Sequence, residues 1–373
     1  MTDSVHSNCL IQGIGTAVPP HRIDRESAAD HAGRLSCHDE SQARKLSMLY
    51  RRSGVQHRGS VLLEESAQGI TQAFYPPLES TDRGPTTQCR SERYAAEAPR
   101  LATDSASQAL QHAGLNADQI THLVTITCTG FYSPGIDVHL IDALGLPRTT
   151  ERVQVGFMGC HGAINGLRVA TGMVARQPTA KVLMCSVELC SLHYQYGYDT
   201  DRIVSGALFA DGSASLVLTG EAIPEMTNGQ PSAPISVAAT ASFLVPNSRD
   251  AMTWLIGNHG YEMTLSATVP GLIEEWLMPF LAPWLEQQGE SMESIQGWAV
   301  HPGGSRILSA VETALPIPSD ALGTSREVLA EHGNMSSATM LMILDRFQQQ
   351  QQPRPWVMLG FGPGLEVEVA LIR

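Results

Sequence analysis

The chain has 373 residues, of which 43% are hydrophobic and 16% are charged, which predicts a large buried core and two subdomains. Its formal net charge of −13 would repel a phosphate backbone, so we expect no nucleic-acid binding. No apolar run reaches the roughly 18 residues of a membrane span. Seven cysteines without a disulfide-like framework, and a start that lacks a signal-peptide pattern, favour a cytoplasmic protein.

Strand and helix patterns alternate along the chain. Helices are predicted over 96–113, closed by Gly114, and over 339–347. The predicted strands cover residues 10–17, 122–127, 181–189, 214–218, 298–300 and 357–360. This alternation predicts an α/β fold in which helices pack on sheets. The polar stretch 71–93 reads as a surface insertion and the glutamine-rich stretch 348–352 as a loop.

Cys160 stands where a short apolar run ends in glycine and a helical pattern begins. Apolar and small residues recur after it at helical spacing, namely Ile164, Leu167, Ala170, Thr171 and Val174. A helix N-terminus stabilises a thiolate, which is the nucleophilic form of cysteine. Cys160 is therefore a candidate nucleophile. His161, directly after it, would either tune the thiolate or simply pack away from it.

Two later segments carry residues that complement Cys160. His301 follows the predicted strand 298–300 and precedes a Pro-Gly-Gly turn. Asn334 stands at the start of the helical segment that leads into 339–347. An imidazole would draw the cysteine toward its thiolate, and His301 with Asn334 would donate hydrogen bonds to a developing oxyanion. Because the chain offers seven cysteines and 13 histidines, the residues alone leave a coincidental pairing open.

These three segments, with Ala207 to Ser213 and the loop Gly360-Phe361-Gly362-Pro363-Gly364, resemble type III polyketide synthases of the chalcone and stilbene synthase family, in particular its bacterial members. The resemblance implies a thiolase fold, layered αβαβα and built from two similar halves. We place the halves at 1–220, with the nucleophile, and 221–373, with the histidine and asparagine. The resemblance also implies a homodimer.

The resemblance further implies the reaction. An acyl-CoA starter would be held on Cys160, and malonyl-CoA would condense onto it with loss of carbon dioxide, repeatedly, before cyclisation. His301 and Asn334 would stabilise the oxyanion of the decarboxylation step. Malonate supplies its own carbanion, so neither a metal nor another cofactor is expected beyond the CoA thioester substrates.

Several residues match the family's gate and cavity positions. Phe209 matches the gating aromatic, although it also reads as a core residue. Met263 stands where plant enzymes carry a second aromatic, and Trp254 where they carry glycine. The flexible thioether would suit an aliphatic chain, whereas the indole would shrink or redirect the cavity. The remaining candidates for the cavity wall are Cys190, Leu192, His193 and Ser336.

Cations are expected where CoA phosphates bind. Lys45 and Arg52 fit the family's CoA-binding positions best, Arg51 lies beside them, and Met48 replaces a third basic residue. A basic cluster is more often a solvated helix face, so both readings stay open. The other candidates for the CoA arm are Gly303, Gly304 and Arg306.

Alternative functions remain at this point. A carrier-protein-dependent ketoacyl synthase is disfavoured by the 360–364 loop and by Met-Ser-Ser-Ala after Asn334. A silent acyl-CoA-binding protein is disfavoured by the intact set of Cys160, His301 and Asn334, and a papain-like hydrolase by the absence of its local sequence context. The cavity set favours an alkylpyrone or alkylresorcinol product, with a malonyl-primed hydroxynaphthalene as the alternative.

Overall fold

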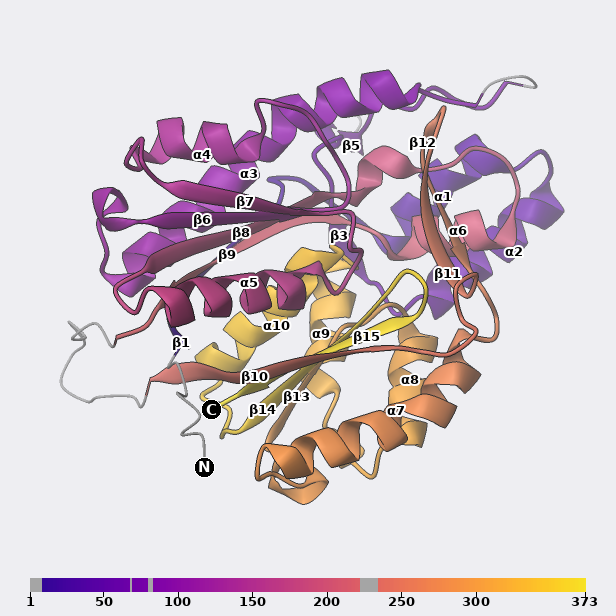
Figure 1. Cartoon of the computed structure of the whole chain (residues 1–373). Helices are drawn as coiled ribbons and strands as arrows, with labels where there is room; N and C mark the ends of the chain where they lie inside the picture. The colour runs from indigo at the N-terminus through magenta and orange to yellow at the C-terminus, as the bar shows by residue number, and fades with distance from the viewer. Residues whose placement is uncertain (1–8, 68, 80–82, 222–233) are drawn as a thin grey trace.

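The computed structural model describes residues 9–67, 69–79, 83–221 and 234–373 (Figure 1). The first eight residues, where the sequence lacks a signal-peptide pattern, lie outside these ranges. So do residues 80–82, which belong to the predicted insertion 71–93. Figure 1 shows five layers, from outer helices through strands, central helices and a second set of strands to a second set of outer helices. The αβαβα order that the resemblance implied is therefore confirmed.

Nine strands form one connected mixed sheet in the order β13-β14-β15-β10-β1-β9-β8-β6-β7. Their bounds are β1 Cys9–Ala17, β6 His122–Thr127, β7 Glu151–Gly156, β8 Lys181–Leu189, β9 Asp211–Thr219, β10 Ile235–Leu244, β13 Gly297–Val300, β14 Trp356–Gly362 and β15 Glu366–Ile372. β1 pairs with β9 along most of its length, and with β10 only through Cys9–Ile11. The first strand of the chain therefore joins the upper and lower sets. β6 runs parallel to β7 and β8, and β13 parallel to β14.

Two helices fill the space between the upper and lower strands. These are α5 (Gly162–Arg176) and α10 (Ser337–Gln349). Every residue of α10 from Ser337 to Leu344 is buried, as expected for a helix that strands cover on both sides. One core cluster unites both helices with residues of the upper and lower strands.

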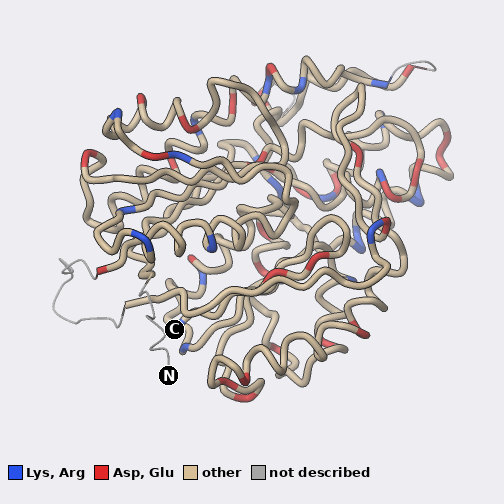
Figure 2. Tube along the Cα trace, viewed as in Figure 1, with Lys and Arg blue, Asp and Glu red and all other residues tan. Residues whose placement is uncertain are grey.

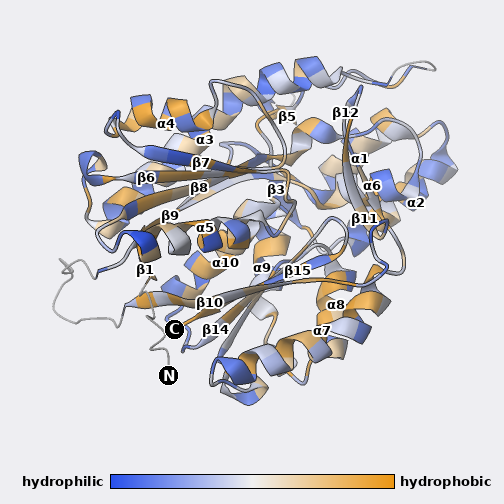
Figure 3. Ribbon diagram, in the orientation of Figure 1, coloured by the Kyte–Doolittle hydropathy of each residue, from blue (hydrophilic) through white to orange (hydrophobic). Residues whose placement is uncertain are grey.

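The outer helices each cover one set of strands. α3 (Thr87–Ala113) and α4 (Ile136–Leu144) pack on the upper strands, and α7 (Val269–Gln287) and α8 (Ser305–Ala314) on the lower ones. Figure 3 shows hydrophobic colour along β6 and β8 and on one side of the outer helices. In Figure 2 the charged residues lie chiefly on outer helices and loops.

Smaller elements gather at the end of the upper layers where β12 is labelled in Figure 1. The helices there are α1 Arg25–Ser36, α2 Glu40–Arg52 and α6 Thr200–Leu208. Elsewhere, α9 Gly323–His332 lies beside α10, and the 3-10 turns are η1 Ala117–Gln119 before β6, η2 Cys190–His193 after β8 and η3 Met292–Ser294 before β13. The short strands are β2 Arg22–Asp24, β3 His57–Gly59, β4 Glu64–Ser66, β5 Gly69–Thr71, β11 Met252–Gly257 and β12 Gly260–Leu265. β11 and β12 form an antiparallel hairpin whose side chains reach the cavities described below.

Three sequence predictions about local structure were wrong in part. The helix predicted over 96–113 begins at Thr87, because the Thr86 side chain caps it and its polar first turns bury Arg90 and Tyr94. The predicted insertion is therefore partly core, and Tyr75 within it is also buried. The glutamine-rich segment is not all loop, since α10 continues through Gln349. Among the helices in the described ranges, none has the length and apolar character needed to cross a bilayer.

Candidate active site

Cys160 lies in the turn between β7 and α5, with His161 as the N-cap residue of the helix. The Ser336 hydroxyl donates a hydrogen bond to its Sγ at 3.6 Å. Burial raises the pKa of Cys160 to about 11, against the opposing hydrogen bonds of Ser336 and Asn334. The resting residue is thus a thiol at neutral pH. Burial thus opposes the predicted thiolate, and the pairing with an imidazole stays a prediction.

His301 directly follows β13 and is 1% exposed. Its backbone NH donates to Leu359 O at 2.8 Å, but neither ring nitrogen has a partner among the described residues. Burial, followed by repulsion from His161, lowers the pKa of His301 to about 3. The imidazole is therefore neutral, with one N–H and one lone pair free for a bound molecule.

Asn334 is joined to the Phe209 segment by backbone hydrogen bonds. Its NH donates to Leu208 O at 2.8 Å, and its carbonyl accepts from the Ala210 NH at 2.9 Å. The Asn334 Oδ1 accepts from the Ser336 NH at 2.8 Å, which orients the amide and leaves its NH2 end as donor. The candidate oxyanion donor and the candidate gate are thus one structural unit.

A cavity of about 30 Å³ adjoins the Cys160 thiol. Its walls are Cys128, Thr129, Gly159, Cys160, Cys190, Phe209, Met252, Thr253, Trp254, Met263, Ser336 and Pro363. Of the predicted residues, Phe209, Met263, Cys190, Trp254 and Ser336 are present. His301 and Asn334 are not among the wall residues.

The sequence reading missed Cys128 and Thr129 in this wall. Both directly follow β6, at the carboxyl end of a strand with parallel neighbours, which is the signal that would have found them. The Cys128 Sγ lies 3.1 Å from Ser336 Oγ. The buried Glu188 carboxylate accepts from the Cys128 NH at 3.0 Å and from Thr129 Oγ1 at 2.6 Å, and so fixes this turn. Burial raises the pKa of Glu188.

A larger cavity of about 120 Å³ adjoins the first, and Cys190, Phe209, Trp254 and Met263 line both. Most of its wall is apolar or aromatic, and it reaches α1, α2 and α6. Members of the wall include Ile23, Ala28, Ala32, Leu35, Tyr50, Leu62, Leu63, Tyr75, Tyr194 and Tyr261. The shared wall is held in place at Trp254, whose Nε1 donates to Cys128 O at 2.8 Å and whose cross-strand partner is Met263.

Two further cavity predictions have different outcomes. His193 lines the larger cavity, stacked on Tyr261 with ring centres 4.0 Å apart, and its Nε2 lies 2.6 Å from Thr129 O. Burial lowers the pKa of His193 to about 3, so it is neutral. Leu192, in contrast, is fully buried in the core under α3 and lines neither cavity, so its assignment to the wall was wrong.

The candidate CoA residues gather where α2 ends and α8 begins. The Ser305 hydroxyl donates to Arg52 O at 3.1 Å, which places the start of α8, after Gly303 and Gly304, against the end of α2. Lys45 and Arg306 are exposed. None of the predicted CoA residues lines either cavity.

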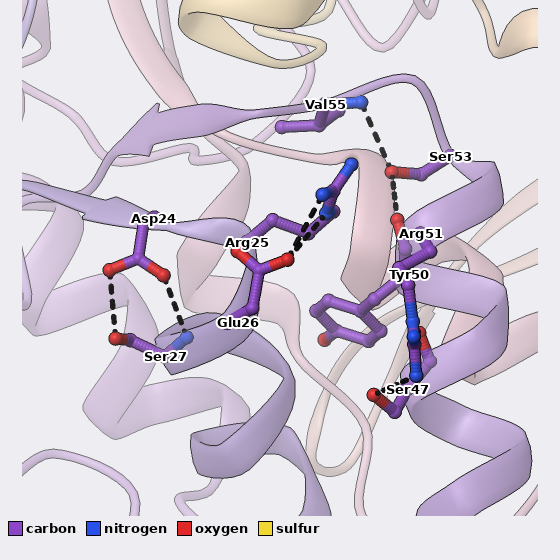
Figure 4. A network of polar contacts seen from close by, with 9 residues as sticks. All are labelled: Asp24, Arg25, Glu26, Ser27, Ser47, Tyr50, Arg51, Ser53 and Val55. Atoms are coloured by element: carbon purple, nitrogen blue, oxygen red, sulfur yellow. Dashed lines mark hydrogen bonds and ion pairs between the residues drawn. The ribbon is translucent and has the colours of Figure 1, made fainter.

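Figure 4 shows the neighbourhood of α2. Arg51 turns back onto its own helix, where its Nη2 donates to Ser47 Oγ at 3.3 Å, so its guanidinium is partly engaged within α2. Arg58, which the sequence reading missed, lines the larger cavity and donates from Nη1 to Phe209 O at 3.4 Å. The structure therefore separates an exposed basic surface from two arginines that line the larger cavity, Arg58 and Arg202.

Comparisons with known proteins identify the family of the chain. The family model for the N-terminal domain of chalcone and stilbene synthases matches residues 2–222, and that for the C-terminal domain matches residues 236–373. The chain is 31% identical to the alpha-pyrone synthesis polyketide synthase-like Pks18 of Mycobacterium tuberculosis, over 96% of this chain and 89% of the relative. It is also 31% identical to 1,3,6,8-tetrahydroxynaphthalene synthase of Streptomyces peucetius, over 97% and 92%.

Solved structures extend the likeness to three dimensions. PKS-I from the brown alga Ectocarpus siliculosus superposes with a TM-score of 0.91 at 28% identity and covers the whole of both chains. The type III polyketide synthase domain of Steely1 from Dictyostelium superposes with a TM-score of 0.85 at 26% identity, over 98% of this chain and 99% of that domain. The chain therefore belongs to the chalcone and stilbene synthase family and is a type III polyketide synthase, an acyltransferase-class condensing enzyme with the thiolase-like fold.

Proposed function

We propose that this synthase extends an aliphatic acyl-CoA starter with malonyl-CoA and releases an alkylpyrone or alkylresorcinol. The observation that carries the proposal is the pair of adjoining cavities, about 30 Å³ beside Cys160 and about 120 Å³ beyond the shared wall. In this proposal the reactive end of the chain lies in the first, beside the thiol, and an apolar tail is stabilised by burial in the second. The alpha-pyrone name of one relative agrees with this assignment.

In this proposal Cys160 attacks the starter thioester. The Cys160 thiol passes its proton to the free nitrogen of the neutral His301, the Sγ–acyl bond forms and the CoA thiolate leaves. The CoA thiolate then takes up the proton held by His301. Because burial raises the pKa of Cys160 to about 11, transfer of the proton during attack serves better than a standing thiolate.

Malonyl-CoA then supplies the carbanion. Its carboxylate leaves as carbon dioxide, and the electron pair forms an enolate whose oxygen accepts hydrogen bonds from His301 and Asn334. The enolate carbon attacks the acyl group on Cys160, a carbon–carbon bond forms, and the Cys160 sulfur leaves as a thiolate that takes up a proton from solvent. The β-ketoacyl-CoA product returns to Cys160 for the next cycle, and cyclisation ends the series. No step requires a metal or redox cofactor, since decarboxylation itself generates the nucleophile.

The proposal extends to the assembly and the surroundings of the enzyme. Strand β7 is the edge of the sheet, and its first four residues are exposed, including Val153 at 40%. Phe131 beside it is 36% exposed. An exposed edge with apolar side chains favours pairing with a second copy, so we assign a homodimer. All seven cysteines are free, which supports a reducing, cytoplasmic location.

A malonyl-primed hydroxynaphthalene synthase is the second candidate. A relative of that name is as similar to this chain as the pyrone-forming one, and the space directly beside Cys160 is small. Incubation with malonyl-CoA and starters from acetyl through long-chain to aromatic, read by mass spectrometry, distinguishes the two. Alkylated cyclic products from long-chain starters support the first assignment, and a naphthalene product from malonyl-CoA alone supports the second. Absence of any cyclised product contradicts both.

A further inference from the structure

Two arginines line the larger cavity, and they differ in whether a carboxylate lies beside them. Arg202 Nη2 lies 3.8 Å from Glu262 Oε2, and Arg202 Nη1 donates to Tyr196 O at 3.2 Å. Arg58 forms no ion pair within the described ranges, and the described residues of this wall include no aspartate or glutamate. Arg58 is therefore a cation without a counter-ion on a wall that is mainly apolar and aromatic, where a bound anion would be attracted.

One side of the Arg58 guanidinium is already engaged by the protein. Its Nη1 donates to Gly206 O and to Phe209 O, the second at 3.4 Å. Its guanidinium carbon lies 5.4 Å from the centre of the Tyr50 ring, close enough for a cation–π contact. Nε and Nη2 have no hydrogen-bond partner in the described part of the chain. These two N–H groups form the edge that holds both oxygens of a carboxylate.

The Tyr50 hydroxyl is a second unpaired donor at the same place. Tyr50 is 1% exposed and lines the cavity, and its hydroxyl has no partner among the residues that the structure describes. In Figure 4 its ring points away from α2. A Cβ at Gly206 would lie 3.4 Å from Tyr50 Oη, so the hydroxyl lies beside the residue whose carbonyl holds Arg58. The two donors thus meet at one residue of α6.

Two other tyrosines of this wall have hydroxyls with protein partners. Tyr75 OH donates to Ser191 O at 2.8 Å, and Tyr194 OH lies 2.8 Å from Ser36 Oγ. Buried hydroxyls are usually paired in this way, because an unpaired one is costly. The unpaired hydroxyl of Tyr50 is therefore available to a molecule bound in the cavity, together with the Arg58 edge.

The position of these donors indicates which carboxylate they would bind. Neither Arg58 nor Tyr50 lines the cavity that holds the Cys160 thiol, and Phe209 belongs to the wall that the two cavities share. The carboxylate of the malonyl extender must leave as carbon dioxide, and an ion pair with arginine would stabilise its ground state and slow that step. A carboxylate at the far end of a starter is not consumed. It would lie in the larger cavity while its thioester lies beside the thiol.

We propose that Arg58 and Tyr50 form a carboxylate subsite in the larger cavity, which selects aliphatic starters that end in a carboxylate. The substrate class is the CoA monothioester of a dicarboxylic acid. Arg58 holds both carboxylate oxygens, and Tyr50 donates to one of them. The cyclised product then carries a side chain that ends in a carboxyl group. This inference rests on the proposed function, in which the larger cavity holds the tail of the starter.

The test measures loading of Cys160 from pairs of CoA esters of equal chain length, one ending in methyl and one in carboxylate. Loading is followed by intact-protein mass spectrometry at low ester concentration, and the ratio of the two rates cancels general effects on folding. The parent should load the carboxylate-ended ester at least as fast as the methyl-ended one. Arg58→Met should lower this ratio about tenfold or more, and Tyr50→Phe several-fold. Arg58→Lys, which keeps the charge but not the edge, should lower it less than Arg58→Met.

Arg202→Met is the matched comparison, because this arginine lines the same cavity beside a carboxylate of its own. It should lower the ratio less than Arg58→Met does, and an equal or larger loss would overturn the assignment. A parent that loads only the methyl-ended ester would overturn it as well. So would an unchanged ratio in Arg58→Met, and a fall in both rates together would show that Arg58 contacts a phosphate of CoA instead.

A binding measurement separates this proposal from the proposed function. Calorimetry of the same two esters with Cys160→Ala, with and without Arg58→Met, gives the ratio of their affinities without any chemistry. Arg58→Met should weaken binding of the carboxylate-ended ester about tenfold or more relative to the methyl-ended one. If the parent forms no polyketide, the proposed function fails, while this ratio still decides the subsite.

Discussion

The two adjoining cavities differ in how their walls are built. Around Cys160 the surface of the cavity is almost wholly apolar, but the wall behind it is tied by hydrogen bonds, with Ser336, Cys128 and Glu188 joining three separate segments. The larger cavity has mainly apolar and aromatic walls from α1, α2, α6 and the β11–β12 hairpin. A site for chemistry must hold donors to within fractions of an ångström, whereas a site for a tail needs only volume and apolar surface. Changes in the first cavity can therefore alter the reaction, and changes in the second the length of the chain accepted, independently of each other.

The largest difference between the two cavities is expected when the thiol itself is removed. Cys160→Ala should lower product formation by about 10³-fold or more, because covalent loading is lost, while the larger cavity is untouched. Binding of a long-chain acyl-CoA, measured by calorimetry, should stay within a few-fold of the parent. Polyketide formation by the variant at a rate near the parent's would contradict the assignment.

The state of the thiol can be read from pH alone. Since burial raises the pKa of Cys160 to about 11, the thiolate fraction should rise about tenfold for each pH unit between 7 and 10. The rate of iodoacetamide alkylation should follow with the same slope, and Cys160→Ala gives the background from the other six thiols. A plateau beginning near neutral pH would instead indicate a thiolate paired with an imidazolium.

The larger cavity can be filled from its rim. Ser205 on α6 lines it and is half-buried, so Ser205→Trp should occupy part of its volume without disturbing Cys160. We expect kcat/KM for long-chain starters to fall about tenfold or more, with little change for acetyl-CoA. Ser205→Ala is the matched control and should keep the parent's preference. Equal losses for short and long starters would show that the tail does not enter this space.

The shared wall should set how the two cavities communicate. Phe209→Leu keeps an apolar side chain but removes the ring that lines both. A several-fold change in starter preference is expected, with Cys160 acylation retained. Acylation is followed by intact-protein mass spectrometry and preference by competition between two starters. Kinetics identical to the parent's would rule out a gating role.

The smallest effects are expected on the exposed basic surface. Lys45→Ala and Arg52→Ala should each raise the KM for malonyl-CoA about two- to fivefold, since solvent and salt screen exposed charges. The increase should shrink at high ionic strength. Arg44→Ala, which removes a neighbouring exposed cation on the same helix, is the control and should leave KM unchanged. Equal KM values in the three variants would place the CoA phosphates elsewhere.

Much of this architecture could be predicted from sequence, and the exceptions have physical causes. The strands over 122–127 and 181–189 were predicted with the observed bounds, because buried strands read as continuous apolar runs. The start of α3 was missed, because Arg90 is buried through hydrogen bonds to carbonyls of Leu192 and Tyr194 that lie about a hundred residues away. Helix propensity, which is a local property of the sequence, does not depend on such contacts.

The site also divides into residues that local motifs identify and residues that only tertiary packing brings in. Motifs identified Cys160, His301 and Asn334, but no local pattern indicates that Cys128 reaches the thiol through Ser336. Leu192 was assigned to the cavity by its neighbours in sequence. In η2, however, the side chains of Cys190 and His193 reach the cavity, whereas that of Leu192 faces α3. Side-chain direction in a short turn is decided by tertiary packing.

The backbone bridge between Phe209 and Asn334 restricts which motions can open a path for substrate beside the thiol, and therefore how fast that path opens. A swinging loop would have to break two main-chain hydrogen bonds and would pull the oxyanion donor out of place at the same time. A turn of the Phe209 ring about its own side-chain bonds disturbs neither. Such rotations take picoseconds to nanoseconds at exposed sites, against microseconds or longer for collective loop motion. Passage of substrate would then be fast relative to turnover, with the donors at rest throughout the cycle.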